Sequence, residues 1–545
     1  MTEDVVRPRG LLGRTLVTWL ACAFALGLWS LATPHLTAPD SPAHDLRAWG
    51  AGHGQVRLVD PGPVEGMPFA SMGVNQLPET LVAAASSVGC YAGQPTVSAG
   101  CLAEIEDRRE PLLAYLNPLG QYHPAYYLAT GWPSRFVGVD DALTADRAVA
   151  VALASLFLAW AIVAARLMPR PHVAVTGVLV ACSPQVLYFG GVLNPNSLEI
   201  LAALAMGACS LAFFVDPDGP HATALGRRAL LAATVLALMR VFSPVWVACW
   251  AALVLALFGM PALRALLRRA NLPWLVLLVL AGVGNVVWTL THLTSLAGDR
   301  EPYARLSFAG AVHASMQQID QTNLAEAVGV FGWKDTLLRA GLVNYYLVAA
   351  VFLIGVCWVF LSRRASLALS GWVAVCYLLP IVLQAVQWND NGPVWQARYT
   401  LPLLVLLPVS AAFLAAASDQ LEGVLHLRLR ALMPAVLLVV GYVQVAAYAT
   451  LLRRNVGGVE GGLTEGDWTP WPGSVPLLTA WTATVIAVWA WVVWLYWRAE
   501  PEQAQPERAQ PSEVSRSRPD TRGGEDLATA GSPPAPGTPP PGQPG

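Results

Sequence analysis

The chain is a succession of long apolar blocks, and this pattern constrains its fold more than any other feature. Each block holds roughly 20 residues, the length that an α-helix needs to cross the ~30 Å hydrocarbon core of a bilayer. Only 12% of the residues are charged, against ~25% in a typical soluble domain. The sequence therefore predicts an all-α polytopic membrane protein and excludes an ordinary water-soluble enzyme. The blocks lie near residues 15–33, 147–166, 172–190, 197–215, 229–260, 273–293, 342–361, 366–386, 399–417, 431–451 and 477–497.

The block from 229 to 260 decides the number of spans. Its 32 residues would make a helix of ~48 Å, which is too long for one crossing. Arg240 and Pro244 lie inside it, and a proline beside a charge favours a break into two short spans. Counting the block twice also places the later basic clusters on the cytoplasmic side, as the positive-inside rule requires. We therefore expect about twelve spans, with both termini in the cytoplasm.

The other segments follow from this topology. Residues 1–14 form a basic cytoplasmic arm. The apolar run that follows is longer than a signal-peptide core of ~7–15 residues, so we interpret it as an anchor in the cytoplasmic membrane. Residues 498–545 are rich in proline and predict a disordered cytoplasmic tail, because such a composition cannot bury a core. Within the membrane domain, 15–497, the predicted external loops are 35–146, 294–341, 387–396 and 453–476.

Cysteine placement and net charge narrow the function further. Cys90 and Cys101 are the only two of eight cysteines outside the apolar blocks. They share the long first external loop, where thiols meet an oxidising compartment, so the sequence predicts a disulfide between them. No zinc-ligand spacing of the CxxC type is present. A net charge of −2 provides no basic field for nucleic acid, so lipid and small molecules are the expected partners.

The segment Pro39-Asp40-Ser41-Pro42-Ala43-His44-Asp45 follows the first span and places two carboxylates and an imidazole at the external membrane face. A structural alternative is open, because Asp40 or Ser41 suits a helix N-cap and Asp45 suits the first helical turn. A carboxylate near the hydrocarbon boundary is costly to desolvate, which favours a functional role. Asp40, His44 and Asp45 are therefore the candidate catalytic residues.

Two external turns hold candidate substrate-binding residues. Asn194 and Asn196 lie in an Asn-Pro-Asn turn between two spans, where the structural alternative is that Asn196 or Ser197 caps the next helix. Trp333 and Asp335 flank Lys334, the only lysine of the chain, in a glycine-punctuated stretch. The alternatives there are anchoring of the tryptophan at the lipid interface and a modest surface ion pair between Lys334 and Asp335.

Two arginines are candidates for holding an anion. Arg398 enters a span at its external edge, where a guanidinium either snorkels to the headgroups or binds a phosphate with two hydrogen bonds. Arg240 lies within an apolar block, so we expect it to face a polar cavity or a partner.

These motifs together resemble DUF2142, a bacterial membrane-protein family that is similar in architecture to the GT-C glycosyltransferases. The family's first motif usually reads Asp-Glu-Pro-Ala-His, so this chain retains Asp40 and His44 and has Ser41 in place of the glutamate. A two-carboxylate site would then require Asp45 as the second acid. The resemblance extends from about Thr37 to Trp471, and the motifs that carry it are Pro39 to His44, Tyr122-His123-Pro124-Ala125-Tyr126-Tyr127, Asn194-Pro195-Asn196, Gly329 to Asp335 and Gln396-Ala397-Arg398-Tyr399-Thr400-Leu401-Pro402.

The resemblance implies a reaction. GT-C enzymes take a sugar from a polyprenyl-phosphate carrier and place an acidic residue of the first external loop near the acceptor, which matches Asp40. Arg398 and Arg240 would hold the lipid phosphate. We therefore expect a glycosyltransferase that modifies a cell-envelope glycan, lipid or protein at the extracytoplasmic face. A divalent metal ion with oxygen ligands is compatible with this chemistry. A transporter or flippase of lipid-linked glycans and a scaffold for envelope assembly are the alternatives.

Overall fold

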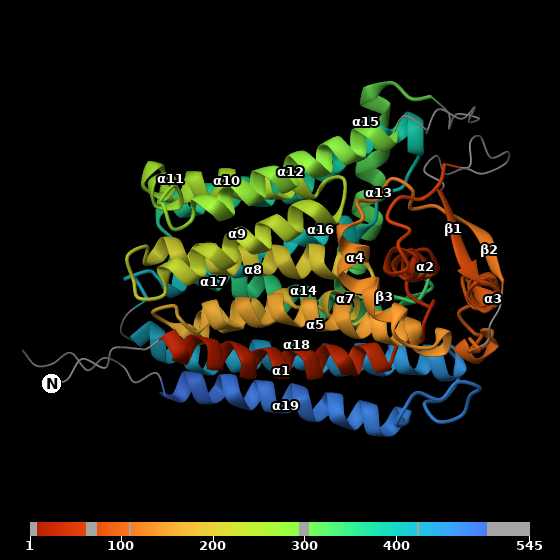
Figure 1. Ribbon diagram of the computed structural model, residues 1–545. Helices are drawn as coiled ribbons and strands as arrows, with labels where there is room; N and C mark the ends of the chain where they lie inside the picture. The colour runs from red at the N-terminus through yellow and green to blue at the C-terminus, as the bar shows by residue number, and fades with distance from the viewer. Residues whose placement is uncertain (1–7, 61–72, 108–110, 294–304, 422–423, 499–545) are drawn as a thin grey trace, which may run out of the picture. The chain divides into compact units, whose positions relative to one another are not determined.

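The structure is a computed structural model that describes residues 8–60, 73–107, 111–293, 305–421 and 424–498. Most of its long helices lie side by side in one bundle (Figure 1). This arrangement confirms the predicted all-α polytopic membrane fold. The long helices of the bundle are α1 (Pro8–Leu31), α5 (Val139–Ala165), α8 (Pro195–Val215), α9 (Ala222–Met239), α12 (Leu272–Leu293), α14 (Ala340–Trp358), α15 (Arg363–Asn391), α18 (Val424–Gly457) and α19 (Ser474–Arg498).

Ten helical segments in the described part of the chain are long and apolar enough to cross a membrane. Nine of them lie in the long helices, and α16 (Ala397–Leu404) with α17 (Leu406–Ala416) forms the tenth. The pair α6 (Pro171–Ala181) and α7 (Pro184–Gly190) adds an eleventh if its 75° bend lies within one span. The apolar helix α10 (Ser243–Phe258) has 16 residues, and its crossing as a twelfth span stays a prediction.

The break that we predicted near Arg240 is confirmed. Helix α9 ends at Met239, and Arg240 has an extended backbone with φ −146° and ψ 168°. Helix α10 then begins at Ser243 with a proline in its first turn and packs beside α9. The chain therefore reverses at Arg240, and this reversal leaves the guanidinium at the end of the bundle rather than in its middle.

Helix α8 occupies the centre of the bundle. Helices α5, α9 and α17 pack against it, and nearly all of its side chains are buried. Small residues permit the close approach: a Cβ on Gly207 would lie 2.2 Å from a methyl carbon of Leu406. The outer helices α12, α14 and α15 instead expose apolar side chains such as Leu280, Val351 and Leu367. Such surfaces are stable only when lipid covers them.

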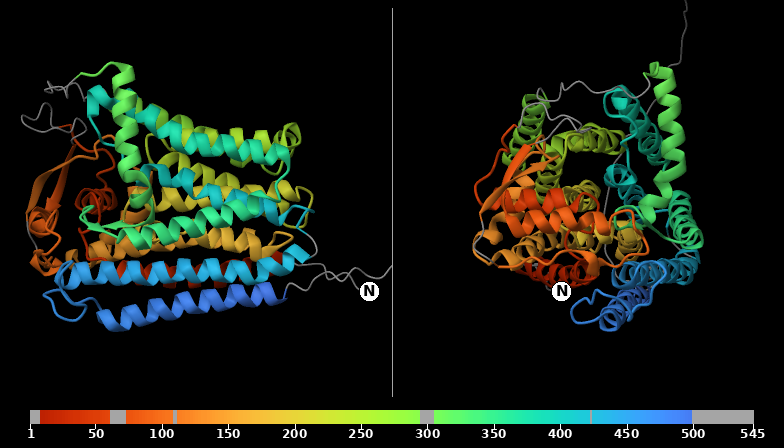
Figure 2. Two further views of the ribbon diagram at one scale, coloured as in Figure 1. Left: turned by 180° about the vertical axis from the view of Figure 1, so that it is seen from behind. Right: turned by 90° about the vertical axis from the view of Figure 1, so that its right-hand side faces the viewer.

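Short elements of the long first loop gather at one end of the bundle (Figure 2). Strand β1 (Gly73–Pro78) pairs antiparallel with β2 (Leu112–Asn117), and α2 packs on α4 and on β1. The remaining elements at this end are α2 (Ser41–Gly52), α3 (Glu79–Ser87), α4 (Ala125–Gly131), the 3₁₀ turns η1 (Val88–Cys90), η2 (Ala99–Cys101) and η3 (Trp132–Arg135), and α13 (Phe308–Val328) with the hairpin β3 (Val330–Phe331) and β4 (Thr336–Leu337). Helix α11 (Met260–Leu266) follows α10.

The predicted boundaries of the cytoplasmic arm, the external loops and the cytoplasmic tail depend on which side of the membrane each segment lies, so they stay predictions. Residues 1–7 of the predicted arm, 294–304 of the second predicted loop and 499–545 of the predicted tail lie outside the described residues. The structure joins Cys90 to Cys101 by a disulfide, with their Cα atoms 6.2 Å apart.

Candidate functional site

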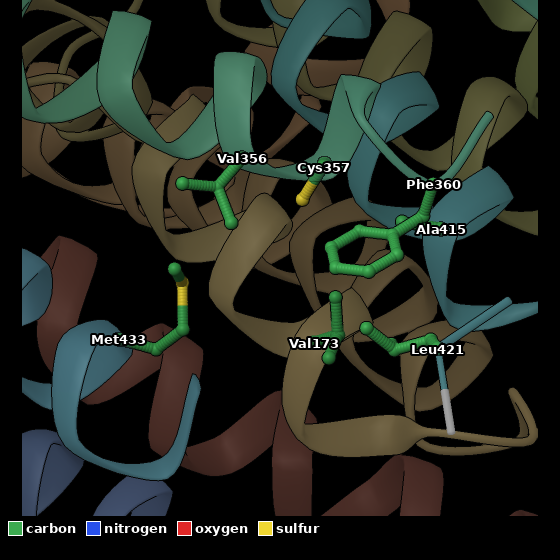
Figure 3. Close-up of a pocket in the computed structure, with 7 residues that line it drawn as sticks. All are labelled: Val173, Val356, Cys357, Phe360, Ala415, Leu421 and Met433. Atoms are coloured by element: carbon green, nitrogen blue, oxygen red, sulfur yellow. The ribbon is translucent and has the colours of Figure 1, made fainter. Parts of the chain in front are cut away.

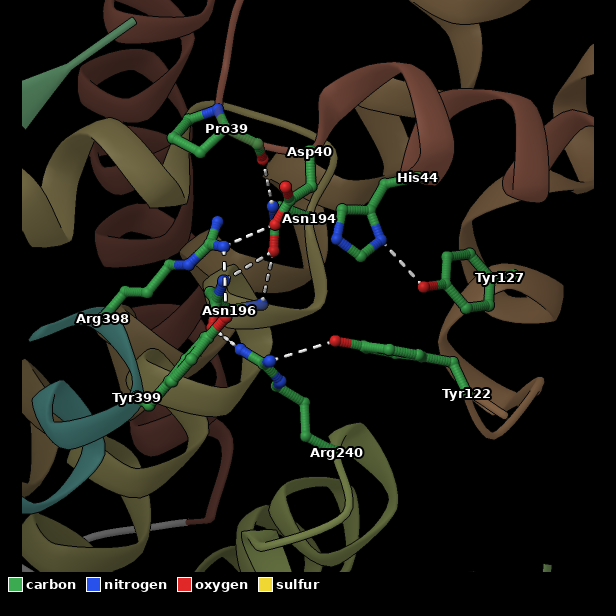
Figure 4. A network of polar contacts seen from close by, with 10 residues as sticks. All are labelled: Pro39, Asp40, His44, Tyr122, Tyr127, Asn194, Asn196, Arg240, Arg398 and Tyr399. Carbon is green, nitrogen blue, oxygen red and sulfur yellow. Dashed lines mark hydrogen bonds and ion pairs between the residues drawn. The ribbon is translucent and has the colours of Figure 1, made fainter. Parts of the chain in front are cut away.

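A network of polar side chains forms where four segments meet at the end of the bundle that carries α2. The segments are the loop after α1, the first turn of α8, the end of α9 and the first turn of α16, and α2 and α4 add His44 and Tyr127 beside them. Figure 4 shows their side chains turned toward one another. Six of the nine candidate catalytic and binding residues lie in this network: Asp40, His44, Asn194, Asn196, Arg240 and Arg398.

Asp40 stands at the N-cap position of α2, but its side chain does not cap the helix. Its carboxylate instead accepts a hydrogen bond from Nη2 of Arg398, 358 residues away. The backbone of Asp40 has φ +58°, a left-handed conformation that costs roughly 1–2 kcal/mol in most L-residues and that aspartate adopts more readily. The capping alternative for Asp40 is therefore wrong, and the loop geometry directs its carboxylate into the network.

Arg398 has donors that the protein does not use. Its side chain is only 5% exposed, and Nη2 serves both Asp40 and the Tyr399 hydroxyl. Nε and Nη1 are buried and have no hydrogen-bond partner. A buried donor without a partner costs about 1–3 kcal/mol. The guanidinium therefore gains stability from a ligand that brings acceptor oxygens.

Arg240 contrasts with Arg398 because its terminal nitrogens both have partners. Nη1 donates to Asn196 Oδ1 at 2.7 Å, and Nη2 donates to the Tyr122 hydroxyl at 3.0 Å. The guanidinium lies 4.1 Å from the centre of the Tyr399 ring, a cation–π contact. The Asn285 amide also donates to the carbonyl oxygen of Arg240. Arg240 thus holds neighbouring side chains in place and raises the local positive potential.

The two asparagines position the loop and the arginine. Asn194 Oδ1 accepts the backbone N–H of Asn196 at 3.0 Å, so Asn194 is the N-cap of α8, and the alternative that Asn196 or Ser197 caps this helix is wrong. The Asn194 amide donates to the carbonyl oxygen of Pro39 at 3.1 Å. The start of α8 therefore anchors the residue that precedes Asp40, while Asn196 orients Arg240.

His44 completes the network. Its Nδ1 lies 2.8 Å from the Tyr127 hydroxyl, and the Tyr127 ring stacks beside it. Burial lowers the pKa of His44 to about 3, with the Arg398 and Arg240 charges adding to this effect against the pull of Asp40. Burial acts to raise the pKa of Asp40, but the charges of Arg398, His44 and Arg240 and the Arg398 hydrogen bond together hold it below its ordinary value. Near neutral pH the imidazole is therefore neutral and the carboxylate is ionised.

Three candidate residues lie apart from the network. Asp45 is buried and accepts a hydrogen bond from the Ser41 hydroxyl at 2.7 Å, so it does not supply a second carboxylate beside Asp40. Trp333 packs against a small apolar cluster of the first loop that includes Leu36. Asp335 is buried and forms an ion pair with Arg454 at 3.1 Å.

The suggested surface pair of Lys334 and Asp335 is also wrong. Lys334 Nζ lies 2.9 Å from Glu326 Oε1 on α13, while Asp335 pairs with Arg454 on α18. Adjacent residues of the hairpin turn therefore contact different helices.

Sequence reasoning missed the aromatic hydroxyls and a second carboxylate. Tyr122, Tyr127 and Tyr399 stand inside the quoted motifs, but those motifs do not reveal which tyrosine faces the site. Glu199 accepts hydrogen bonds from the Ser243 hydroxyl at 2.8 Å and the Trp246 indole at 3.1 Å. A signal for Glu199 was present, because a single acid in an apolar block marks a polar site by default.

The residues of the network do not fit a divalent cation. Within the described part of the chain no group of three His, Cys, Asp or Glu side chains is placed to hold a metal. Asp40 is paired with Arg398 and lies near Arg240, and two guanidinium charges repel a cation. The arrangement suits an anion instead.

An apolar hollow lies near the ends of α14 and α17, away from the network, and has no lining side chain suited to a sugar or phosphate (Figure 3). Val173, Phe360 and Met433 are among its apolar walls. It is therefore not a candidate for the same chemistry.

Comparison with known proteins places the chain in a family. No protein of curated function matches the sequence. The family described as "Predicted membrane protein (DUF2142)" matches residues 22–407, a range that contains all six residues of the network. The chain therefore belongs to the DUF2142 family of predicted membrane proteins.

Proposed function

We propose that the protein is a membrane glycosyltransferase that moves a sugar from a polyprenyl-phosphate donor to a cell-envelope glycan, lipid or protein at the extracytoplasmic face of the cytoplasmic membrane. The observation that carries this proposal is the buried guanidinium of Arg398, which is fixed by Asp40 and keeps two donors free. A phosphate provides the acceptor oxygens that these donors lack. The proposal includes a GT-C-like arrangement of the spans.

The reaction matches the two ends of the ion pair. The acceptor hydroxyl oxygen forms a bond to the anomeric carbon of the sugar, and the bond between that carbon and the phosphate oxygen breaks. The electron pair leaves with the phosphate, whose growing negative charge Arg398 stabilises. The hydroxyl proton passes to a base within hydrogen-bond reach, and Asp40 is ionised and 47% exposed for this role.

His44 and Arg240 support these two residues. The neutral imidazole of His44 is fixed by Tyr127 and orients the acceptor beside Asp40. Arg240 has its terminal donors in use, so it acts on the phosphate through its charge rather than through direct hydrogen bonds. Asn194 and Asn196 keep the Asp40 loop and Arg240 in register.

The position of the network favours an enzyme over a flippase. A flippase lines a path through the bilayer midplane with polar groups, whereas the network lies at the ends of α8, α9 and α16. An exterior of exposed apolar side chains on α12 and α15 provides the surrounding in which a polyprenyl chain is soluble.

The test is release of polyprenyl phosphate from a polyprenyl-phosphate sugar by the purified protein in lipid vesicles, in the presence of envelope acceptors. Acceptor-dependent release supports the proposal. Movement of the intact lipid-linked sugar between leaflets without cleavage would establish the flippase alternative instead. If the protein neither releases polyprenyl phosphate nor moves the lipid-linked sugar, the scaffold alternative would replace the proposal.

A further inference from the structure

A hollow beside Arg398 is lined by polar residues from three other segments. It is small, with room for about one water molecule, and it opens partly to solvent. Its polar walls are Gln185 of α7, Glu326 of α13, Lys334 of the hairpin turn, and Gln396 with Arg398 at the start of α16. The hollow therefore brings two cationic side chains to one place.

The unpartnered N–H donors of Arg398 suit this hollow to a ligand with acceptor oxygens. Nη2 is turned to Asp40, and the other terminal nitrogen points away from Asp40 (Figure 4). The Arg398 side chain is only 5% exposed, and its Nε and Nη1 are both buried without a partner. Both nitrogens are enclosed, so an anion reaches them only when a wall of the hollow moves, but it need not displace Asp40, which is held by Nη2.

Lys334 is held at the hollow by a strained turn. Its backbone has φ +64°, a conformation that is rare for a lysine and that persists only where the surrounding structure imposes it. The next residue, Asp335, is tied to the buried Arg454, which fixes the turn. The Lys334 side chain is 38% exposed, and its Nζ lies 2.9 Å from Glu326 Oε1.

Glu326 also lines the hollow, and its charge is already balanced. Oε1 accepts from Lys334, and Oε2 accepts the backbone N–H of Ala397 at 3.1 Å. Because Ala397 precedes Arg398, this contact joins α13 to the turn that carries the guanidinium. Because an ammonium group carries three N–H donors, Lys334 can contact an incoming anion and keep its pair with Glu326 at the same time.

We infer that this hollow binds the phosphate of a lipid-linked phosphate ester between Arg398 and Lys334. The inference deepens the proposed function, on which it rests, by adding Lys334 as a phosphate ligand from the hairpin. Asp40 and the phosphate then contact different nitrogens of one guanidinium, so the base and the leaving group are held at a constant separation.

Binding to the full-length protein in detergent micelles tests the inference without requiring turnover. The probes are a polyprenyl phosphate and, separately, inorganic phosphate, and the readout is the dissociation constant from calorimetry. Lys334→Gln should weaken polyprenyl phosphate binding roughly 10-fold through loss of a charged contact. Lys334→Arg should retain most of the affinity. Arg339→Gln is the matched control, because it removes an exposed cation five residues farther along the same segment.

The outcomes separate the possibilities. Wild-type affinity in a folded Lys334→Gln protein, or an equal loss in Arg339→Gln, would overturn the site. Lys334-dependent binding of inorganic phosphate as tight as that of the lipid would support the anion site but reject a lipid source. Lys334-dependent lipid binding in a protein that never transfers sugar would keep the site and reject the glycosyltransferase. Sugar transfer with Lys334-independent binding would do the reverse.

Discussion

Two arginine–aspartate pairs at the same end of the bundle have different surroundings. Arg454 and Asp335 are 0% and 7% exposed. Asp335 also accepts the Gly93 N–H at 3.2 Å and the Thr336 hydroxyl at 2.9 Å. In the other pair Arg398 is buried, but Asp40 is 47% exposed and contacts few groups besides the guanidinium.

The two arginines also differ in how many of their N–H donors have partners. Arg454 donates from both terminal nitrogens, to the carbonyl oxygens of Val97 and Tyr91 and to Asp335. Its guanidinium also lies 3.8 Å from the centre of the Tyr91 ring. Arg398 uses only Nη2. Nε of Arg454 is also buried without a partner, but Arg398 leaves the terminal nitrogen Nη1 unpartnered as well. The Arg454 pair therefore joins segments of the fold, whereas the Arg398 pair keeps a terminal nitrogen for a further group.

The largest effect should come from Asp335→Asn. This change leaves the buried Arg454 without its charge partner, which costs about 3–5 kcal/mol in buried pairs. Thermal unfolding of the detergent-solubilised protein should show a fall of many degrees or a loss of folded protein on expression. An unchanged unfolding temperature would mean that the Arg454 pair does not join these segments.

Loss of the Cys90–Cys101 disulfide should be the next largest effect. The two cysteines are 11 residues apart, so the chain-entropy estimate for closing the loop is about 3 kcal/mol. Tyr91 follows Cys90 and stacks on Arg454, so Cys90→Ser with Cys101→Ser should destabilise the same region. Mass spectrometry of the unreduced protein checks the bond directly, and two free thiols there would refute it.

Asp40→Asn should separate the two pairs most clearly. Asparagine tolerates the left-handed backbone of this position and keeps an oxygen for Arg398, and because the Asp40 side of the pair is half exposed, the stability loss should be smaller than in Asp335→Asn. Sugar transfer should fall roughly 100-fold or more, since the amide cannot take a proton. Asp335→Asn is the opposite case, with a stability loss and no direct effect on the proton. Near-normal turnover in Asp40→Asn would remove Asp40 as the base.

Arg398→Lys should have a smaller effect on donor binding. A lysine retains the positive charge but loses the several N–H groups of the guanidinium, so it cannot serve Asp40 and a phosphate together. The dissociation constant for polyprenyl phosphate should rise roughly 10-fold, equivalent to about 1.4 kcal/mol. Arg240→Lys offers the comparison, because there the lost contacts are to Asn196 and Tyr122, and folding should suffer more than binding. Equal effects of both changes on binding would contradict the different roles assigned to them.

The contrast between the two pairs also marks what the sequence predicts. The apolar block lengths and the charge at Arg240 predict the helices and the break in the 229–260 block, because hydrophobicity and helix length act locally. Asp40, His44 and Arg398 are identifiable as candidates because charges at a membrane boundary are costly. These are properties of single residues and short segments.

Pairing is not a local property. Asp40 and Arg398 are separated by 358 residues, and Asp335 and Arg454 by 119. Asp40 meets Arg398 because Asn194 at the start of α8 anchors the Asp40 loop and α8 packs on α16 and α17, through close contacts such as Gly207 with Leu406. The sequence therefore predicts both Asp40 and Asp335 as site residues, the first catalytic and the second substrate-binding, since both are acids in predicted external loops. Only the packed structure distinguishes the enclosed pair from the open one.

The predicted topology puts both pairs on the extracytoplasmic side, and labelling can test this without any change in stability. The twelve-span topology puts Arg268, at the opposite end of the chain's helices, in the cytoplasm. Its side chain is 45% exposed and pairs with Asp218, so a cysteine there is accessible to a reagent on its own side. Arg268→Cys should resist a membrane-impermeant thiol reagent in intact cells and react after permeabilisation. Thr464→Cys, exposed in the predicted external loop 453–476, is the positive control, and the unmodified protein corrects for the native thiols. Efficient labelling at position 268 in intact cells would mean that the bundle has the opposite orientation in the membrane. Both ion pairs, and the proposed reaction, would then lie at the cytoplasmic face.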